Sequence, residues 1–407
     1  MNIWILNHYA ITPDMPGSTR HYDFGKELLK RGHEVTIFAS SFLHHGERKE
    51  LKLLEGEKWK MENVDGINFV WLKTFSYQKN NWRRIINMLF YMHRSYWLGK
   101  SITQTNHLNK PDIIIGSSPQ LLSLLSSYWL AKHYRVKYIA ELRDLWPQNL
   151  IDIGELRKNS SIARILRLLE KYLYKHAAKI ILLSPAAKSY LTSLGINQNN
   201  LCVIPNGVDL SLYNNNLDNK QEKGNIFKIM YTGTLGVFYE LDQLLKTAKI
   251  VQDKGYKDIK FIFVGSGVKK LELIEKSKEL KLKNIQFVNP VPKIKMPSVL
   301  KDAGAFLLKR NKIFYGSSNK LMDYMASKKP VIFSTSTNDS VAQKAECGLS
   351  VTSGKAEDFA KSIINLYKMS PKQRAKMGQN GRRYVEKYYN IPVLATKLEE
   401  VIHETTN

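Results

Sequence analysis

The chain has 407 residues, of which 43% are hydrophobic, and a formal net charge of +26. This length exceeds what one hydrophobic core usually serves, so two domains of about 200 residues each are expected. No apolar run approaches the ~18 residues of a membrane-spanning helix, and the two cysteines, Cys202 and Cys347, have no metal-ligand spacing around them. We therefore expect a reduced, two-domain globular protein without structural zinc or disulfides.

The positive charge calls for an acidic partner, and three are open: nucleic acid, an anionic membrane face or phosphorylated substrates. Lysines and arginines are scattered along the chain, and no zinc-finger spacing or RNA-binding signature is present. We therefore expect no nucleic-acid partner. The first predicted strand, residues 3–6, is too short and too uncharged at its start for a signal peptide, so a cytoplasmic location is expected.

Short apolar strands alternate with helix patterns in the first half. Residues 3–6, 34–38, 67–72, 112–116 and 138–140 are predicted strands, and residues 19–30, closed by Gly32, are a predicted helix between the first two. A strand, a helix and a second strand in this order predict a parallel βαβ unit. We expect a Rossmann-like domain over residues 1–200.

The second half repeats this alternation. Strands are predicted at residues 228–231, 260–264, 285–288, 305–308, 331–333 and 349–351, with a glycine turn at 233–236 and a helix at 240–251. The Asn- and Lys-rich run at 214–225 is the expected linker. We expect a second Rossmann-like domain over 201–380 and a last helix, 381–407, that crosses back to the first domain. Two doubly wound parallel sheets that face one another leave a central cleft at the carboxyl ends of their strands, where such sheets bind ligands.

A candidate phosphate site opens the helix predicted after Ser318. Ser318 can cap this helix, so that backbone N–H groups near Asn319 and the positive end of the helix dipole face a phosphate. Lys320 adds a positive charge, and Asp323, one turn later, offers two acceptor oxygens to a ribose diol. The alternative is an ordinary amphipathic helix with an early acid that answers its dipole.

Charged residues also follow the strand predicted at 138–140. Glu141, Arg143 and Asp144 come just past its end, where a carboxylate can meet sugar hydroxyls and an arginine can meet a phosphate. The alternative is an internal Arg–acid pair with Asp144 as a helix cap. Arg20, at the start of the first helix, is expected to point into the same cleft.

Residues 82–98 form a further predicted helix with two unlike sides. One side carries Trp82, Ile85, Ile86, Leu89, Phe90 and Trp97, and the other carries Arg83, Arg84, Asn87 and Arg94. Rings at a membrane interface, with arginines at anionic headgroups, have this pattern. A helix that packs its apolar stripe into the core has it as well, so both alternatives stay open.

The first half carries a glycine loop and a first helix at residues 16–24, which run on to residues 30–35. The second half carries Pro-Asn-Gly-Val-Asp at 205–209, Phe-Val-Gly-Ser-Gly at 263–267 and a Val-Pro turn at 291–292. With these motifs the chain resembles, over nearly its full length, the family-4 glycosyltransferases, which have the two-domain GT-B fold. Residues 141–147, Glu-Leu-Arg-Asp-Leu-Trp-Pro, resemble the subgroup that includes L-fucosamine-type transferases of surface polysaccharide assembly.

This resemblance implies a retaining, metal-independent enzyme that moves a sugar from a nucleotide diphosphate to an acceptor hydroxyl. Negative charge builds on the leaving diphosphate, so cations and N–H donors must surround it. Asp323 is expected to hold the ribose and the turn at 291–292 to receive the base. The implied donor-binding residues are Gly17, Arg20, Gly233, Thr234, Leu235, Gly236, Val291, Pro292, Ser318, Asn319, Lys320 and Asp323. The expected catalytic residues are Glu141, Arg143, Asp144 and Lys320, with no metal and no other cofactor.

Three positions depart from the family pattern. Tyr315 stands where the first acid of the paired motif belongs, eight residues before Asp323. Asp323 itself is one methylene shorter than the usual glutamate. Thr234 and Tyr239 stand near where Arg and Lys are expected after the glycine turn. The candidates to replace these cations are Lys309, Arg310 and Lys312.

We therefore expect transfer of an N-acetylated hexosamine from a UDP donor to a lipid-linked saccharide, carried on polyprenyl diphosphate, in surface polysaccharide or lipopolysaccharide synthesis. The expected place is the inner face of the cytoplasmic membrane, where the protein is peripheral on an anionic surface. The alternatives are a transferase with a soluble acceptor and a non-catalytic nucleotide-binding protein on the same fold. A UDP-sugar epimerase shares the architecture but needs paired catalytic acids that the sequence does not offer.

Overall fold

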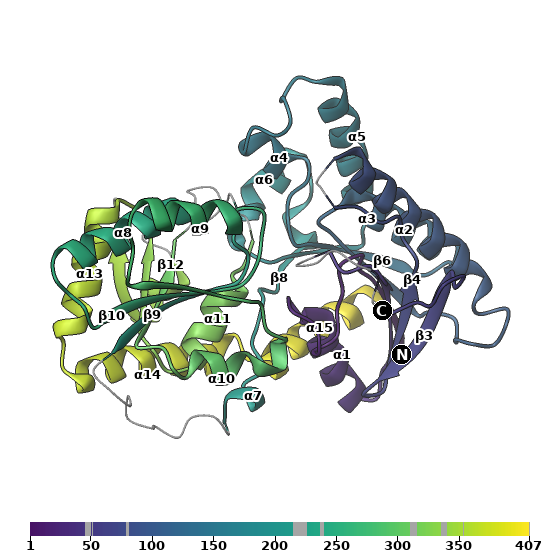
Figure 1. The fold of residues 1–407 in the computed structure, drawn as a ribbon. Coiled ribbons are helices and arrows are strands. Elements are labelled where there is room, and N and C mark those ends of the chain that lie inside the picture. The colour runs from purple at the N-terminus through teal and green to yellow at the C-terminus, as the bar shows by residue number, and fades with distance from the viewer. Residues whose placement is uncertain are drawn as a thin grey trace.

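The structure is a computed structural model that describes residues 1–44, 50, 52–78, 81–214, 226–236, 240–309, 316–334, 340–352 and 354–406. It consists of two α/β domains, each built on a largely parallel sheet with helices packed against it (Figure 1). The chain passes from the first domain to the second after β8 and returns at its carboxyl end. The two doubly wound domains predicted from the sequence are confirmed.

Eight strands form the first sheet, in the order β3-β4-β2-β1-β5-β6-β7-β8. They are β1 Asn2–Leu6, β2 Glu34–Ser40, β3 Trp59–Val64, β4 Ile67–Leu72, β5 Ile113–Ser117, β6 Lys137–Leu142, β7 Lys179–Leu182 and β8 Leu201–Val203. All neighbours are parallel except β3, which pairs antiparallel with β4. The sequence does not predict β3, a partly exposed edge strand, or the short strands β7 and β8.

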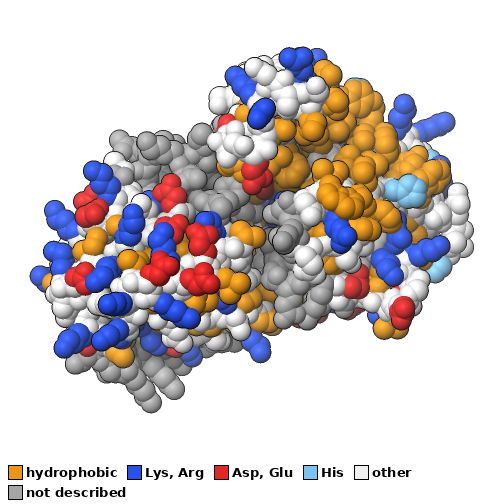
Figure 2. All heavy atoms as spheres, turned by 45° about the horizontal axis from the view of Figure 1, so that its top comes forward, with side chains coloured by type: hydrophobic (Ala, Val, Ile, Leu, Met, Phe, Trp, Pro, Cys, Tyr) orange, Lys and Arg blue, Asp and Glu red, His pale blue; other side chains and the backbone are white. Residues whose placement is uncertain are grey.

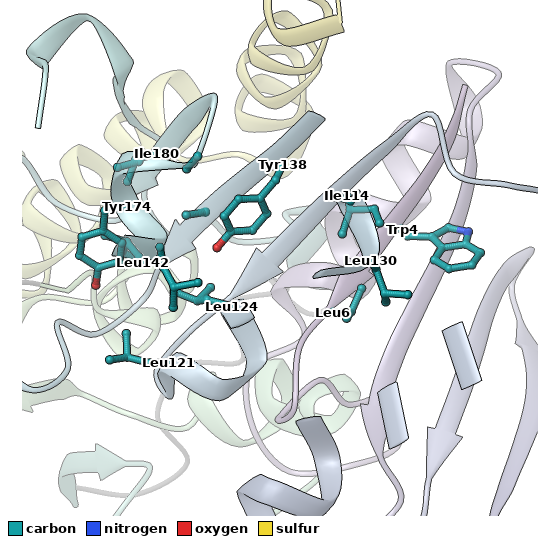
Figure 3. Close-up of a cluster of buried hydrophobic side chains, with 14 of the residues drawn as sticks. Trp4, Leu6, Ile114, Leu121, Leu124, Leu130, Tyr138, Leu142, Tyr174 and Ile180 are labelled. Carbon is teal, nitrogen blue, oxygen red and sulfur yellow. The ribbon is translucent and has the colours of Figure 1, made fainter. Parts of the chain in front are cut away.

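Alternate residues of the central strands serve opposite faces of this sheet, as the pleat requires. Trp4 and Leu6 of β1 join the buried cluster of Figure 3, while Ile3 and Ile5 join the cluster on the other face. Because both faces are covered, the strand is a continuous apolar run without polar alternation. This is why β1 could be recognised in the sequence despite its short length.

Helices cover the two faces of the first sheet separately. They are α1 Arg20–Lys30, α2 Trp82–Ser101, α3 Leu121–Tyr134, α4 Gln148–Asp152, α5 Ser161–Lys175 and α6 Lys188–Ser193. Side chains of α2, α3 and α5 join the cluster of Figure 3, whereas those of α1 join the opposite cluster. No described helix is long and apolar enough to cross a membrane.

The second sheet has six strands, all parallel, in the order β11-β10-β9-β12-β13-β14. They are β9 Phe227–Thr232, β10 Ile259–Val264, β11 Ile285–Val288, β12 Ala305–Leu308, β13 Val331–Ser334 and β14 Gly348–Val351. Its helices are α7 Ser211–Asn214, α8 Leu241–Asp253, α9 Lys270–Glu279, α10 Met296–Leu300, α11 Asn319–Ala326, α12 Val341–Lys344, α13 Ala356–Lys368 and α14 Pro371–Tyr388. Short 3-10 helices lie at Pro185–Ala187, Gln198–Asn200 and Lys293–Lys295.

The last helix, α15 Ile391–Thr406, packs on α1 of the first domain (Figure 1). Its apolar side chains, such as Leu394 and Ile402, belong to the core cluster of that domain. Glu399 pairs with Arg31 (2.7 Å) and also contacts His33 (2.9 Å). The chain crosses between the domains directly before this helix, where Val208 N–H donates to the Tyr389 carbonyl (2.9 Å).

Helix α2 buries the side that carries Asn87 and exposes most of its apolar stripe. Asn87 lies opposite the stripe, as predicted, and is fully buried, where it donates to the Thr74 hydroxyl (2.8 Å) and the Phe75 carbonyl (2.7 Å). Trp82 and Trp97 of the stripe are 59% and 54% exposed. The stripe is therefore turned away from the core, and the hydrogen bonds of Asn87 fix this rotation of the helix.

Candidate active site

A buried network at the carboxyl end of the first sheet centres on Glu141 of β6. Its Oε1 accepts from Arg20 Nε (2.8 Å), and its Oε2 accepts from the Ser117 hydroxyl (2.7 Å) and lies 2.7 Å from His21 Nε2. Burial alone would raise the pKa of Glu141, but Arg20, His21 and Ser117 hold it well below its usual range. Glu141 is therefore ionised, and both of its oxygens are engaged within the protein.

His21 is a member of this network that the sequence did not single out. Burial lowers its pKa in spite of the neighbouring Glu141, so the ring is neutral near pH 7. Its Nδ1 lies 2.8 Å from the side-chain amide nitrogen of Asn7, which can only donate. The ring proton is therefore on Nε2 and points to Glu141. His21, on α1, is therefore held in one tautomer by Asn7, which directly follows β1, and by Glu141.

Arg20 joins the two domains. Besides Glu141, its guanidinium donates to the carbonyls of Pro205 (2.6 Å) and Ile204 (2.9 Å). Asn206, the next residue, donates from Nδ2 to the Ser317 carbonyl (2.9 Å), directly ahead of α11. The Pro-Asn-Gly motif is thus a joint between the Glu141 network and the start of α11. The contact of Arg20 with a donor stays a prediction.

Arg143 and Asp144 follow β6 toward the cleft. The Ser118 hydroxyl oxygen accepts from the backbone N–H groups of both residues, at 2.8 and 3.3 Å. Among the described residues the Arg143 guanidinium has no hydrogen-bond partner, which leaves it available to an anion. Burial raises the pKa of Asp144 to about 6, against the opposing charges of Arg143 and Arg84. The pair therefore offers a cation and an acid that titrates near neutral pH.

In the second domain, the glycine turn after β9 brings backbone and side chains unusually close. Gly233 has a φ of +114°, which favours glycine, and a Cβ on it would lie 2.4 Å from Lys320 Cε. Gly265, after β10, would place a Cβ 1.9 Å from the Gly233 carbonyl oxygen. Of the other turn residues, Thr234 is exposed, whereas Leu235 and Gly236 are buried. The turn is therefore packed against both β10 and α11.

The start of α11 adds positive potential to this turn. The Ser318 hydroxyl accepts from Leu321 N–H (3.3 Å) and caps the helix, with Asn319 as its first residue. Lys320 extends across Gly233, and its Nζ lies 5.1 Å from the centre of the Tyr231 ring. The helix N-terminus and an ammonium group thus converge beside the glycine turn, an arrangement suited to an anion.

Asp323, one turn further along α11, is held by two donors on one oxygen. Its Oδ1 accepts from the Tyr213 hydroxyl (2.8 Å) and from Lys293 Nζ (2.5 Å). Within the described part of the chain, Oδ2 accepts no hydrogen bond, and the side chain is 11% exposed. The carboxylate is therefore oriented by the protein and keeps one oxygen for a ligand.

The turn at Val291 and Pro292 faces the first domain. The next residue, Lys293, donates from its backbone N–H to the Met15 carbonyl (3.3 Å), in the loop ahead of α1. Gly17 of that loop has a φ of +145°, in the region that favours glycine. The predicted base turn and the Gly-loop therefore meet where the two domains touch, next to Asp323.

Lys309, one candidate to replace the missing cations, is engaged elsewhere. It is buried, donates to the Gly354 carbonyl (2.6 Å) and pairs with Glu240 (2.9 Å). Arg310, Lys312, Tyr315 and Tyr239 lie outside the described residues. The cations that the described residues bring to the cleft include Lys320, Lys293 and Arg143.

Lys293 and Tyr213 are the site residues that sequence reasoning missed. Lys293 directly follows the Val-Pro turn, but one lysine in a chain with 62 Lys and Arg residues carries no signal of its own. Tyr213 lies four residues after the Pro-Asn-Gly-Val-Asp motif and reaches Asp323 only through the fold. Their role depends on tertiary contacts that no local pattern encodes.

A possible metal-ligand group lies away from the cleft, where α15 meets His33, the residue before β2. In the described residues, ligand atoms of His33, Glu399 and His403 all lie within 4.8 Å of one another. Arg31 already pairs with the same carboxylate at 2.7 Å, so its charge would oppose a metal cation there. The group is better explained as a contact between α15 and the first domain.

Comparisons with known proteins extend over both domains. "Glycosyltransferase Family 4" matches residues 17–212, and "Glycosyl transferases group 1" matches residues 214–384. No curated protein sequence matches the chain.

Solved structures with the same fold include sucrose-phosphate synthase from Thermosynechococcus elongatus, at 14% identity and a TM-score of 0.72, covering 99% of this chain and 98% of that one. HepE from Anabaena, in complex with UDP, has 15% identity and a TM-score of 0.69, covering 99% and 100%. WaaG, a glycosyltransferase involved in lipopolysaccharide biosynthesis, has 11% identity and a TM-score of 0.68, covering 98% and 99%. With a family-4 match over its first domain and a group-1 match over its second, the chain belongs to the GT-B glycosyltransferases.

Proposed function

We propose that this protein is a retaining, metal-independent transferase that moves an N-acetylated hexosamine from UDP to a lipid-linked saccharide. We place it in surface polysaccharide or lipopolysaccharide synthesis, within the L-fucosamine-type subgroup that residues 141–147 resemble. Two structural neighbours support the direction of this proposal: HepE forms complexes with UDP and UDP-glucose, and WaaG takes part in lipopolysaccharide biosynthesis.

The observation that carries the proposal is the arrangement of α11 against the glycine turn. Lys320 crosses Gly233 at the start of the helix, and Asp323 presents Oδ2 one turn away, beside the turn at Val291 and Pro292. A nucleoside diphosphate has its diphosphate, ribose and base in this same order. We assign the diphosphate to the glycine turn and Lys320, the ribose diol to Asp323, and the base to the Val-Pro turn.

The chemistry follows from this placement. As the glycosidic bond breaks, negative charge builds on the diphosphate, and Lys320, the N-terminal end of α11 and Arg143 stabilise it. The departing diphosphate oxygen takes the proton of the acceptor hydroxyl, so no protein base is needed. Asp144 accepts a hydrogen bond from a sugar hydroxyl. Glu141, whose oxygens are both engaged, acts through Arg20 and His21 as a positioning residue.

The lipid-linked acceptor is supported by the surface of the first domain. Helix α2 exposes tryptophans on the same domain that carries Arg143 and Asp144. The net charge of this helix is positive. A protein with this surface works at the inner face of the cytoplasmic membrane as a peripheral enzyme. A soluble acceptor would give these exposed rings no role.

The test is a thermal-unfolding panel, run without metal and with EDTA, because a ligand that binds only the native state raises the melting temperature. We expect UDP and one UDP-N-acetylhexosamine to raise it, and GDP and ADP to leave it unchanged. The sugar nucleotide that binds is then assayed for transfer to a polyprenyl-diphosphate-linked acceptor. Binding of UDP without transfer or hydrolysis of any donor would favour the non-catalytic alternative, and no shift with any nucleotide would contradict the proposal.

A further inference from the structure

Large hydrophobic side chains are exposed on three neighbouring helices of the first domain. Of the sixteen that are exposed among the described residues, ten lie on α2, α3 and α5. On α5, Ile162, Ile165 and Leu168 are 62%, 64% and 71% exposed. Figure 2 shows hydrophobic side chains gathered over this part of the molecule. Soluble proteins scatter such residues singly, and a contiguous cluster marks a site of interaction.

Aromatic contacts join the three helices into one surface. The Tyr96 ring of α2 meets the Trp129 ring of α3 edge to face, with centroids 5.5 Å apart, and it also contacts Trp97. Tyr128 of α3 meets Tyr172 of α5 in the same way, at 5.6 Å. We call this surface, from Trp82 of α2 across α3 to α5, the apolar face.

The apolar face is fixed in its orientation by hydrogen bonds on the inner sides of the helices. Besides the bonds of Asn87, Ser95 of α2 donates to Ser126 of α3 (3.0 Å), and both hydroxyls are buried. On α5, Glu170 is buried and accepts from the Tyr190 hydroxyl (2.8 Å). Rotating α2 or α5 to bury the apolar stripes would break these bonds. The exposure is therefore built into the fold.

The charge of the apolar face is of one sign. Helices α2 and α5 carry four Lys or Arg residues each, and Glu170, which is buried, is the single acid on the three helices. Arg94 lies over the Phe90 ring and Lys100 over the Trp97 ring, at 5.6 and 5.1 Å from the ring centres. Basic groups that lie beside aromatic rings suit the anionic headgroup layer above a hydrocarbon interior.

A groove of about 770 Å³ opens beside α2, between this helix and the edge strand β3 with its neighbour β4. Its apolar lining includes Trp59, Leu72, Leu89 and Phe90, with Arg94 at its side. The groove is large enough for an apolar chain. It adjoins the apolar face, with which it shares Leu89, Phe90 and Trp97.

The apolar face begins at the rim of the cleft. Arg84, in the first turn of α2, lies over the ring of Trp146, two residues after Asp144, at 5.5 Å. We propose that the apolar face docks the protein on a bilayer that contains anionic lipids, with the groove beside α2 taking a lipid chain. The proposal deepens the proposed function, because a lipid-linked acceptor would then reach Arg143 and Asp144 from the bilayer. Docking itself needs no catalysis.

The test is sedimentation of the full chain with vesicles of phosphatidylcholine, alone and with added phosphatidylglycerol. We expect binding to the anionic vesicles at low salt, and weaker binding at about 0.5 M NaCl, where exposed charges are screened. Ile165→Glu with Leu168→Glu should weaken binding by about tenfold or more, because both residues would enter the hydrocarbon boundary. The matched control is Leu271→Glu on α9, since Leu271 is 76% exposed and lies on the other domain. It should bind like the unchanged protein.

Three outcomes would overturn the docking proposal. The first is that the unchanged protein does not bind anionic vesicles. The second is that the α5 variant and the Leu271 variant lose vesicle binding equally. The third is that light scattering shows a dimer of the unchanged protein and a monomer of the α5 variant. The last would make the apolar face an interface between two copies of the chain. The UDP melting shift, measured on the same variants, separates the two proposals: a retained shift without vesicle binding sinks the docking and leaves the proposed transferase intact.

Discussion

Lys293 lies where the domains meet, and its positive charge acts on two carboxylates. It pairs with Asp323 at 2.5 Å, and its charge also acts on Asp23 of α1. Burial is the larger effect on Asp23 and raises its pKa to about 6, with Asp209 and Asp323 adding to the rise. A nucleotide that binds Asp323 therefore meets a carboxylate whose charge is partly balanced, which reduces its repulsion of the nearby diphosphate.

Asp144 should make kcat/KM depend on pH in a measurable way. Because its pKa is raised to about 6, it is protonated below that pH and ionised above it. If the ionised form binds a sugar hydroxyl, kcat/KM falls as the pH drops through about 6. We expect Asp144→Asn to lower kcat/KM at pH 8 and to remove this acidic limb.

The control for the pH profile is Glu170→Gln in α5. Burial raises the pKa of Glu170 to about 7, but the residue lies in the helix that forms the apolar face and not in the cleft. The acidic limb should persist in this variant. If the acidic fall in kcat/KM persists in Asp144→Asn, the group that titrates is not Asp144.

At the scale of elements, the contact between the glycine turn and α11 sets the geometry of the proposed donor site. Gly233→Ala places a methyl group 2.4 Å from Lys320 Cε at a φ of +114°. We expect a fall in the melting temperature and a weaker UDP-induced shift, because Lys320 must move. The backbone strain alone costs about 1–2 kcal/mol.

Gly255→Ala separates the strain from the contact. Gly255 has a φ of +81°, and a Cβ on it would meet nothing within 4 Å. This variant should lose a similar amount of stability from strain and keep the full UDP shift. Equal UDP shifts in both variants would show that Lys320 does not contact the nucleotide.

Elements with strong local patterns were the ones that the sequence predicted best. The predicted bounds of β4, β11 and β12 agree with the structure, because each is a mainly apolar segment bounded by polar or turn residues. Strand β3 has no such run, since it is a partly exposed edge strand that pairs antiparallel with β4. Its place depends on a partner that is distant from any motif.

The candidate site likewise contains residues that local patterns predicted and residues that only the fold brings together. Ser318, Lys320 and Asp323 could be selected because capping, charge and spacing lie within one short helix. The donors that orient Asp323, Tyr213 and Lys293, come from segments 110 and 30 residues away. No periodicity relates such segments, so these contacts required the structure.

At the scale of the whole molecule, two connections link the domains in addition to the contact of Lys293 with the Met15 carbonyl. Arg20 binds the backbone of residues 204 and 205, and Asn206 continues the connection to the loop before α11. Helix α15 forms the second connection, from Val208 and Tyr389 to the core beneath α1. The residues of the second domain that we propose to hold the donor are thereby linked to the Glu141 network of the first domain.

The proposed nucleotide site is tested most sharply by calorimetric titration of UDP into the unchanged protein, Asp323→Asn and Asp242→Asn. Asp242 is the matched control, because it forms a Lys–Asp pair with Lys276 at 2.7 Å between α8 and α9. We predict that UDP binds the unchanged protein and the Asp242 variant alike. Asp323→Asn should bind about tenfold or more weakly, through the loss of a charged hydrogen bond worth about 1.5–3 kcal/mol. Equal affinity in all three proteins would contradict the assignment of the ribose to Asp323, and no UDP binding to the unchanged protein would contradict the nucleotide-sugar site itself.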